Sequence, residues 1–531
     1  MKSIRDYTHS DIFYCGLVIM AIGLPLSKFL MSISQMILVA NWLIQGGISN
    51  KLKLLFKNKA AIVVCSFYLV YVVGLLHSSN WEYALNELRI KLPLFIIPFI
   101  LATSPPLSLH LFYRLMNFFV GAVLLGTLAS MGELLGVNDL FRHLLGIPTS
   151  SLLDIREISL FISHIRFSLM ICLATFYLFY IIIWKSPVSR LYLLCCWLLI
   201  VWFLSFLFLI ESVTGFAITF SIGLVLIGYL ACAKNKRWVQ IFIACWVVII
   251  PIGVLGYLYS MYNEFTDVTP VDVNQLEKLT AQGNPYIHDI HNTQVENGNY
   301  IWMYMCKKEL QEEWSKRSQY DYHGLDKRNQ ELEYTLIRFL ASKGLRKDAE
   351  GIKQLTNEEI HVIENGIANL NNMHNSLHSR IYNIIWEIDD YLRGGNPGGH
   401  SVTQRFEYWK TAGLVIMNNL WVGTGTGDLM DEMNIEYKSQ ATSLEQQYWK
   451  RPHNQFLSIA GALGIMGLMG FVFSILYPLF VLPEKRDILY AIFLLIVLGS
   501  MVSEDTLDTQ AGVTFFAFFN ALFLFSRLNR N

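Results

Sequence analysis

The chain has 531 residues, of which 53% are hydrophobic and 15% charged, and its mean hydropathy is +0.40. A soluble domain of this length has a larger fraction of charged residues and a smaller fraction of hydrophobic ones, so the composition indicates a polytopic membrane protein. The 41 basic and 41 acidic residues balance to a formal net charge of zero. That balance excludes both a global basic field for nucleic acid and an acidic tail.

Apolar segments long enough to cross a membrane recur from the N-terminus onward. Lys2 and Arg5 precede the first one, but no small-residue cleavage site follows it, so it is expected to be a retained helix and not a cleaved signal. The fourth is short and contains Pro93 and Pro98, which interrupt helices. Twelve membrane helices are predicted: 12–27, 29–45, 60–77, 90–104, 112–133, 159–183, 191–209, 213–232, 238–259, 453–482, 487–503 and 509–526.

Basic residues are concentrated in alternate short loops, which places those loops in the cytoplasm and both termini with them. The other loops, such as 210–213 and 504–508, contain no Lys or Arg. The long polar insertion therefore faces outward, and its apolar residues at three- and four-residue spacings predict amphipathic helices. The expected fold is all-α, with nine membrane helices in residues 1–261, a helical extracytoplasmic loop domain in 262–452 and three membrane helices in 453–531.

The eight cysteines show neither a disulfide nor a zinc pattern, because their spacings are wrong for both. Asp389 and Asp390 are adjacent and not alternate, so they do not form an Asp-x-Asp pair for a divalent ion. The sequence predicts no metal and no cofactor.

One arginine lies inside an apolar segment: Arg166 is in the outer half of the predicted sixth helix, two residues after His164. A guanidinium there costs several kcal/mol unless an anion, a cavity or a dipole compensates. Either Arg166 extends to the interface or pairs with a carboxylate at a helix end, or it receives a phosphate through paired hydrogen bonds.

A second arginine opens the apolar-faced stretch 402–420 that leads back to the membrane. Arg405 has Trp409 one turn later. It is either an ordinary solvated charge, as most arginines are, or a second contact for an anion.

His453 stands where the polar insertion meets the uncharged segment 455–482. An imidazole ordinarily titrates near neutral pH and can serve as a general base for an attacking hydroxyl. The alternative is an interfacial residue with its ring among the lipid headgroups.

Two polar runs remain. Glu504, Asp505 and Asp508 form an acidic turn between the last two helices, and they either orient His453 or an arginine or face solvent, as such turns usually do. The run GTGTGD at 423–428 lacks the Lys-Ser/Thr and the strand-to-helix context of a P-loop, so we expect a flexible turn there.

The pattern of His453-Asn454, followed after nine residues by Gly464-x-x-Gly467, resembles the O-antigen ligase and O-antigen polymerase superfamily. The segment RFEYWKTAGLVIMNNLWVGTGTGD is similar to the part of that family before its catalytic His. Twelve helices with a large loop between the ninth and tenth extend the resemblance over nearly the whole chain. It departs at 211–215, where many members carry a Ser-Arg pair. Arg166 and Lys91 could supply the cationic contacts instead.

The resemblance implies glycosyl transfer from undecaprenyl diphosphate at the periplasmic face of the bacterial inner membrane. The acceptor is a lipid A-core sugar in ligases, another lipid-linked glycan in polymerases and a protein hydroxyl in a third branch; the His-Asn and Gly spacing favours the ligase. Transfer from an activated donor requires only that the charge of the leaving group is held and that the acceptor hydroxyl is deprotonated, so we expect no metal. Direct attack on the anomeric carbon would invert its configuration. Membrane lipids are the further partners expected, and no nucleic acid is. His453 is the catalytic candidate. The substrate-binding candidates are Arg166, Arg405, His164, Asn454, Lys91, Arg451 and Glu504.

Two other classes of protein would explain some of these features. A flippase for lipid-linked sugars would also need interior arginines. Its sequence would be expected to show two matching halves and paired broken helices, and this sequence shows neither. An outward receptor or scaffold has no use for His453. Replacing His453 discriminates, since only the enzyme would lose turnover while it still binds the donor.

Overall fold

The computed structural model describes residues 4–137, 158–185, 189–233, 237–268, 271–272, 275–373, 377–440, 442–482 and 487–526. The described part of the chain is mostly helical, and the strands described in it are β1 (Val295–Glu296) and β2 (Asn299–Tyr300), paired antiparallel. By packing, the chain divides into two compact units. Unit 1 comprises residues 1–150, 156–226 and 404–531, and unit 2 comprises residues 151–155 and 227–403.

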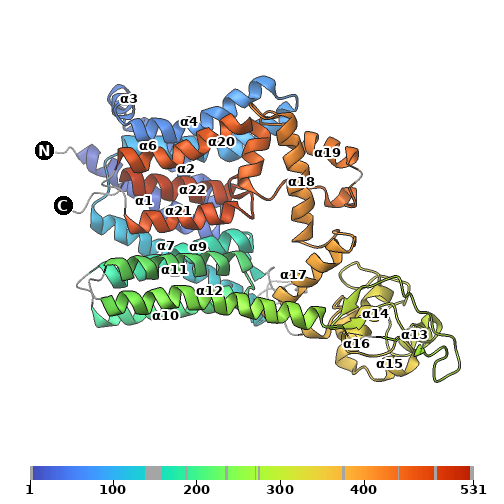
Figure 1. Ribbon diagram of the computed structural model, residues 1–531. Helices are drawn as coiled ribbons and strands as arrows, with labels where there is room; N and C mark the ends of the chain where they lie inside the picture. The colour runs from blue at the N-terminus through green and yellow to red at the C-terminus, as the bar shows by residue number, and fades with distance from the viewer. Residues whose placement is uncertain are drawn as a thin grey trace. The chain divides into compact units, whose positions relative to one another are not determined.

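Unit 1 is a bundle of apolar helices, in which α20 packs on α4, α22 on α6 and α21 on α9 (Figure 1). Its helices are α1 (Ile4–Leu26), α2 (Lys28–Ile44), α3 (Ile48–Lys57), α4 (Lys59–Val73), η1 (Gly74–His77), α5 (Trp81–Lys91), α6 (Pro93–Thr103), α7 (Leu109–Leu134), α9 (His164–Trp184), α10 (Arg190–Leu209), α18 (Thr403–Asn418), α19 (Leu429–Ser439), η5 (Gln446–Tyr448), α20 (Gln455–Val481), α21 (Ile488–Met501), η7 (Thr506–Asp508), α22 (Gln510–Ala521) and η8 (Leu522–Ser526). The helix α11 (Val213–Ala233) begins in unit 1.

Short polar side chains define where many of these helices begin. Each such residue accepts hydrogen bonds from backbone N–H groups of the first turn, which have no partner inside the helix. The residues that cap unit 1 helices in this way are Ser27, Asn58, Asn80, Ser108, Ser189, Asn454, Asp487 and Thr509.

Seven helices in the described ranges are long and apolar enough to cross a membrane, or eight if α2 and α3, bent by 111°, count as one span. Helices occupy all twelve segments predicted to cross. However, α6 has 11 residues and rises about 16 Å, short of a hydrocarbon core of about 30 Å, and α21 and α22 are also short. The protein is a multi-pass membrane protein, and twelve crossings remain a prediction.

Unit 2 has its own hydrophobic core, built on Trp314, Leu336 and Phe339, which are fully buried. Its helices are α12 (Arg237–Thr266), α13 (Lys307–Ser315), α14 (Leu332–Ser342), α15 (Ala349–Lys353), α16 (Asn357–Glu364), η4 (Leu370–Asn372) and α17 (Leu377–Leu392).

The predicted loop domain, 262–452, extends past the end of this compact unit. Residues from Gln404 onward pack within unit 1, because the inner face of α18 lies against the segment that leads into α20. Tyr408 donates to the carbonyl oxygen of Tyr448 at 2.9 Å, and Trp409 donates to that of Pro452 at 2.9 Å.

Candidate active site

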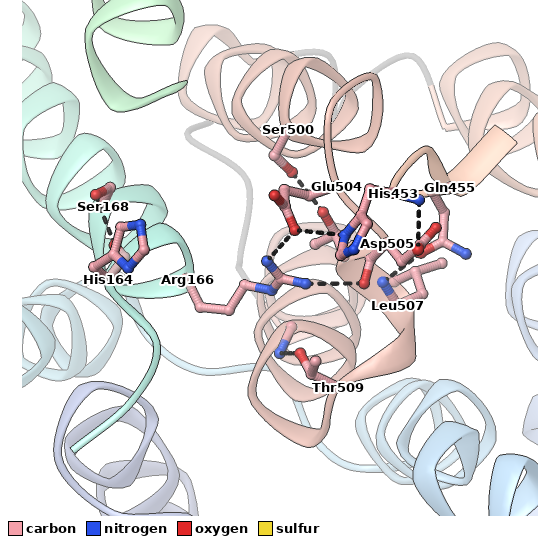
Figure 2. A network of polar contacts seen from close by, with 12 residues as sticks. His164, Arg166, Ser168, His453, Gln455, Ser500, Glu504, Asp505, Leu507 and Thr509 are labelled. Carbon is pink, nitrogen blue, oxygen red and sulfur yellow. Dashed lines mark hydrogen bonds and ion pairs between the residues drawn. The ribbon is translucent and has the colours of Figure 1, made fainter. Parts of the chain in front are cut away.

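Three basic side chains meet on the carboxylate of Glu504, in the turn between α21 and α22, and Figure 2 shows two of them, Arg166 and His453. Arg166, in the first turn of α9, donates from Nη1 to Oε2 and from Nη2 to the carbonyl oxygen of Asp505, at 3.0 Å each. Arg405, in the first turn of α18, donates from Nη2 to Oε1 at 2.8 Å. Nδ1 of His453 lies 3.7 Å from Oε2. We call Arg166, Arg405, His453 and Glu504 the site cluster.

The members of the site cluster differ in how far they are exposed. The side chains of His453 and Arg405 are 34% and 26% exposed, whereas those of Arg166 and Glu504 are 8% and 6% exposed. Glu504 is therefore an internal anchor, and the imidazole and one guanidinium are the groups that an incoming molecule can reach.

The backbone of His453 is held in an uncommon conformation, with φ +49°. A left-handed backbone at a bulky residue costs roughly 1–3 kcal/mol and persists only where its surroundings fix it. The N–H of His453 donates to Oδ2 of Asp505 at 3.0 Å, and Ser458 donates to Oδ1 of the same carboxylate at 2.6 Å. Asp505 thus ties the turn at His453 to the first turn of α20.

The charges around the acidic turn shift its carboxyl groups in opposite directions. Burial raises the pKa of Glu504, but the imidazole of His453 and the charges of Arg166 and Arg405 outweigh burial and lower the pKa to about 2. Burial, and then the charge of Asp508, raise the pKa of Asp505. Glu504 is therefore ionised at every physiological pH and balances the cations around it.

A second group of charges, which we call the ion quartet, consists of Glu87, Lys91, Arg451 and Asp508. Nζ of Lys91 lies 2.7 Å from Oδ1 of Asp508 and also contacts Glu87. Nη1 of Arg451 lies 3.0 Å from Oε1 of Glu87 and 2.9 Å from Oδ2 of Asp508. Burial raises the pKa of Asp508, but the charges of Arg451 and Lys91 outweigh it and lower the pKa to about 2. Two acids and two bases thus balance within the protein.

The glycine run at 423–428 is packed and buried, so the flexible turn expected there is wrong. The run fills a kink in α20, where Gly464 has φ +67° and a Cβ would lie 2.3 Å from the carbonyl carbon of Trp421. Backbone N–H groups of the run donate to carbonyl oxygens just before the kink at 2.9 Å each: Thr424 to Gly461 and Gly425 to Ala462. These bonds compensate for helix bonds that the kink breaks.

The structure brings four of the sequence-selected residues together and separates the others. Arg166, Arg405, His453 and Glu504 converge from segments far apart in the chain. His164 begins α9, where its carbonyl oxygen accepts from Ser168 at 2.7 Å, and Figure 2 draws its ring apart from His453 and Glu504. It therefore has no place in the site that we propose.

Three more candidates have partners that explain them without a substrate. Lys91 and Arg451 belong to the ion quartet, and Lys91 is 1% exposed. Asn454 is the N-cap of α20: its Oδ1 accepts from Phe456 and Leu457, at 3.0 and 3.1 Å, and its Nδ2 donates to the carbonyl oxygen of Val502 at 2.9 Å. The asparagine next to His453 thus fixes the start of the helix and ties it to the acidic turn.

The two residues that hold the turn at His453 are Asp505 and Ser458. The sequence left open whether the acidic turn that contains Asp505 orients His453 or an arginine or faces solvent, and Asp505 is buried; Ser458, among apolar residues of α20, was not selected. Three acidic residues in five between apolar helices were the available signal. In the part of the chain that the structure describes, no group of three His, Cys, Asp or Glu side chains is arranged to hold a metal ion.

The comparison with protein families agrees with this geometry. No curated protein matches the chain. The family model described as O-antigen ligase matches residues 363–472, the part that contains α18, Arg405, His453 and the kink at Gly464. The match supports the resemblance to the O-antigen ligase superfamily over this part of the chain.

Proposed function

We propose that the protein is an O-antigen ligase of the bacterial inner membrane that works at the periplasmic face. It moves a glycan from undecaprenyl diphosphate to a sugar hydroxyl of the lipid A core. The family match supports the class of substrate. The observation that carries the chemistry is a partly exposed imidazole and a partly exposed guanidinium held beside one buried carboxylate.

His453 is the general base. Its Nδ1 faces Oε2 of Glu504 at 3.7 Å, so the carboxylate favours the tautomer with the proton on Nδ1 and leaves Nε2 to accept a proton. When Nε2 takes the proton of the acceptor hydroxyl, the imidazolium that forms is stabilised by the negative charge of Glu504. Glu504 is therefore a positioning residue that acts through His453.

Arg405 holds the diphosphate of the leaving group. A guanidinium offers five N–H donors in a planar fork, so a partly exposed arginine can contact Glu504 and a phosphate oxygen at the same time. Arg166 is less exposed and links Glu504 to the backbone of Asp505, so it positions the carboxylate. Fixed cations at the place where charge develops lower the barrier without reorganisation during the reaction.

The glycosyl transfer needs no reactant other than the donor and the acceptor. The acceptor oxygen forms a bond to the anomeric carbon of the glycan while the bond from that carbon to the diphosphate oxygen breaks. The hydroxyl proton passes to Nε2 of His453, and the bonding electron pair leaves with undecaprenyl diphosphate. Direct attack inverts the anomeric configuration, and the arginines supply the positive charge that a metal would otherwise provide.

The test is transfer of a labelled undecaprenyl-diphosphate-linked glycan by the purified protein in the presence of chelator, with lipid A core and a second lipid-linked glycan as competing acceptors. Label on the core supports the ligase. We expect His453→Ala to lower kcat by about 10²–10⁴, the usual contribution of a general base. His361, an exposed histidine of α16, is the matched control, and His361→Ala should keep full activity.

The same assay contains the results that contradict the proposal. Ladders of longer lipid-linked glycan would make the protein a polymerase of the same superfamily. Absence of transfer by folded protein, with movement of the lipid-linked glycan across a vesicle membrane, would make it a flippase. Full activity of His453→Ala would exclude the imidazole as the base.

A further inference from the structure

The helix α18 turns polar side chains toward the protein. Glu407 is 5% exposed and accepts from Thr442 at 3.0 Å, and Gln404 and Thr411 are also buried. A helix at a water-facing surface does the opposite, with its apolar side inward and its charges outward. The inner face of α18 thus contains more polar side chains than the inner face of an amphipathic helix at a water-facing surface.

The outer face of α18 and the residues just after it carry large apolar side chains. Phe406, Met417, Leu420 and Trp421 are exposed and form what we call the apolar stripe. Met417 is 74% exposed and Trp421 is 66% exposed. Lys410 is also exposed on this face, and a long basic side chain there can reach the lipid headgroups. Large apolar side chains gathered on one side of a helix mark a surface that contacts an apolar partner.

The apolar stripe continues into the exposed side of a candidate membrane span. Backbone N–H groups of α20 at its kink donate to the last residues of the stripe: Ile465 to the carbonyl oxygen of Leu420 at 2.8 Å, and Met466 to that of Trp421 at 3.3 Å. Beyond the kink, α20 exposes Met466, Met469 and Phe473, each more than half exposed. Within unit 1, α18 runs crosswise to α20, α21 and α22 (Figure 1).

We propose that α18 lies in the plane of the membrane and that lipid hydrocarbon covers the apolar stripe. Because α20 crosses the bilayer, a helix joined to it at the kink and running crosswise lies along the interface. An amphipathic helix in that position buries its apolar face about 5–10 Å below the headgroups. Tryptophan is enriched at that depth.

The membrane contact sets the depth of the site, a consequence that rests on the proposed function. Arg405 is on the same helix as the apolar stripe, in the turn before Trp409, and it contacts Glu504. With the stripe in the hydrocarbon, the guanidinium of Arg405 lies near the level of lipid phosphates. A diphosphate attached to a membrane-embedded chain then reaches Arg405 without leaving the bilayer.

The test places a fluorescent amino acid at position 417 of the full-length protein in lipid nanodiscs. Phospholipids brominated high on the acyl chain should quench it, while aqueous iodide should not. The matched control is position 435 on α19, where Ile435 is 59% exposed as a single apolar residue among polar ones. Iodide, and not bromolipid, should quench the fluorophore there.

If water or protein covers the apolar stripe instead of lipid, the fluorophore at position 417 gives a different quenching result, and either result overturns the proposal. Quenching by iodide at 417 means water, and quenching by neither reagent means that protein covers the stripe. Transfer activity is measured on the same nanodiscs. Bromolipid quenching without any glycan transfer would leave the membrane contact in place and refute the proposed function.

A paired substitution tests the link to the reaction. Met417→Asp puts a charge into hydrocarbon and should weaken bromolipid quenching of a fluorophore at position 421 and raise KM for the lipid-linked donor. Ile435→Asp should change neither. If Met417→Asp leaves both quenching and KM as in the unaltered protein, the stripe does not contact lipid.

Discussion

The site cluster and the ion quartet are built on the same acidic turn, yet they leave different groups accessible. Glu504 in the site cluster carries two arginines and an imidazole, and His453 and Arg405 remain partly exposed. In the ion quartet, two acids face two bases; Glu87, Lys91 and Asp508 are nearly inaccessible, and Arg451 is 20% exposed. Acidic and basic side chains of the same kinds thus form one group whose imidazole is partly exposed and another that is largely buried.

The difference lies in charge balance and in access. The ion quartet has equal numbers of positive and negative groups, so it has no excess charge to offer an anion. The site cluster sets two guanidinium groups against one carboxylate, and its more exposed members, Arg405 and His453, are both basic side chains. Because Arg451 lies two residues before His453, the ion quartet also anchors the chain that carries the imidazole.

The largest effect should come from unbalancing the ion quartet. Glu87→Gln leaves Lys91 and Arg451 with one carboxylate, and removing one partner of a buried ion pair costs about 3–5 kcal/mol. Glu82 is exposed on the same helix, so Glu82→Gln should change stability by less than about 0.5 kcal/mol. Thermal unfolding of the detergent-solubilised variants measures both. Equal melting midpoints would show that the quartet does not stabilise the fold.

The acid limb of the stability profile should depend on Glu504. Its folded pKa of about 2 lies below its unfolded value, so the stability it contributes is complete above the unfolded pKa and is lost as pH falls toward 2. The loss amounts to about 3 kcal/mol. Melting midpoints between pH 6 and pH 3 should therefore fall less steeply for Glu504→Gln than for the unaltered protein. Parallel profiles would mean that Glu504 is not held by the cations around it.

The activity of Glu504→Gln should separate the two groups of charges functionally. The amide keeps the shape but cannot stabilise the imidazolium, so we expect kcat per folded molecule to fall about 10²-fold with little change in KM. Glu87→Gln should retain most of its kcat per folded molecule, because Glu87 touches no member of the site cluster. If both variants lose kcat equally, the distinction between a chemical and a structural group fails.

The sequence led to the residues of the candidate site through the cost of placing charges near apolar helices. Arg166 was found because a guanidinium in an apolar segment needs a partner, and His453 because it stands where a polar segment meets a membrane helix. The helices themselves were predictable for the same reason, since apolar segments must satisfy their backbone internally. Asn454 could also have been predicted as a cap, because it directly precedes a helix.

Pairings between distant segments could not be read from the sequence. The partner of Arg166 lies 338 residues further along the chain, and no spacing rule connects them. The acidic turn has the composition of an exposed loop, and only packing shows that Asp505 is buried. The kink at Gly464 is equally hidden, because a glycine in an apolar helix does not show whether its backbone is left-handed.

The smallest effect should come from replacing the planar guanidinium of Arg405 with an ammonium group, which keeps the charge but not the shape. Arg405→Lys keeps a positive charge on α18 but loses the planar fork that can contact Glu504 and a diphosphate together. We expect KM for the lipid-linked donor to rise about tenfold, or about 1.4 kcal/mol, with a smaller change in kcat. Lys410→Arg, on the exposed side of the same helix, is the control and should behave as the unaltered protein. A fall in kcat at constant KM would place Arg405 with Glu504 as a positioning residue, because only a group that grips the donor before reaction changes its apparent affinity.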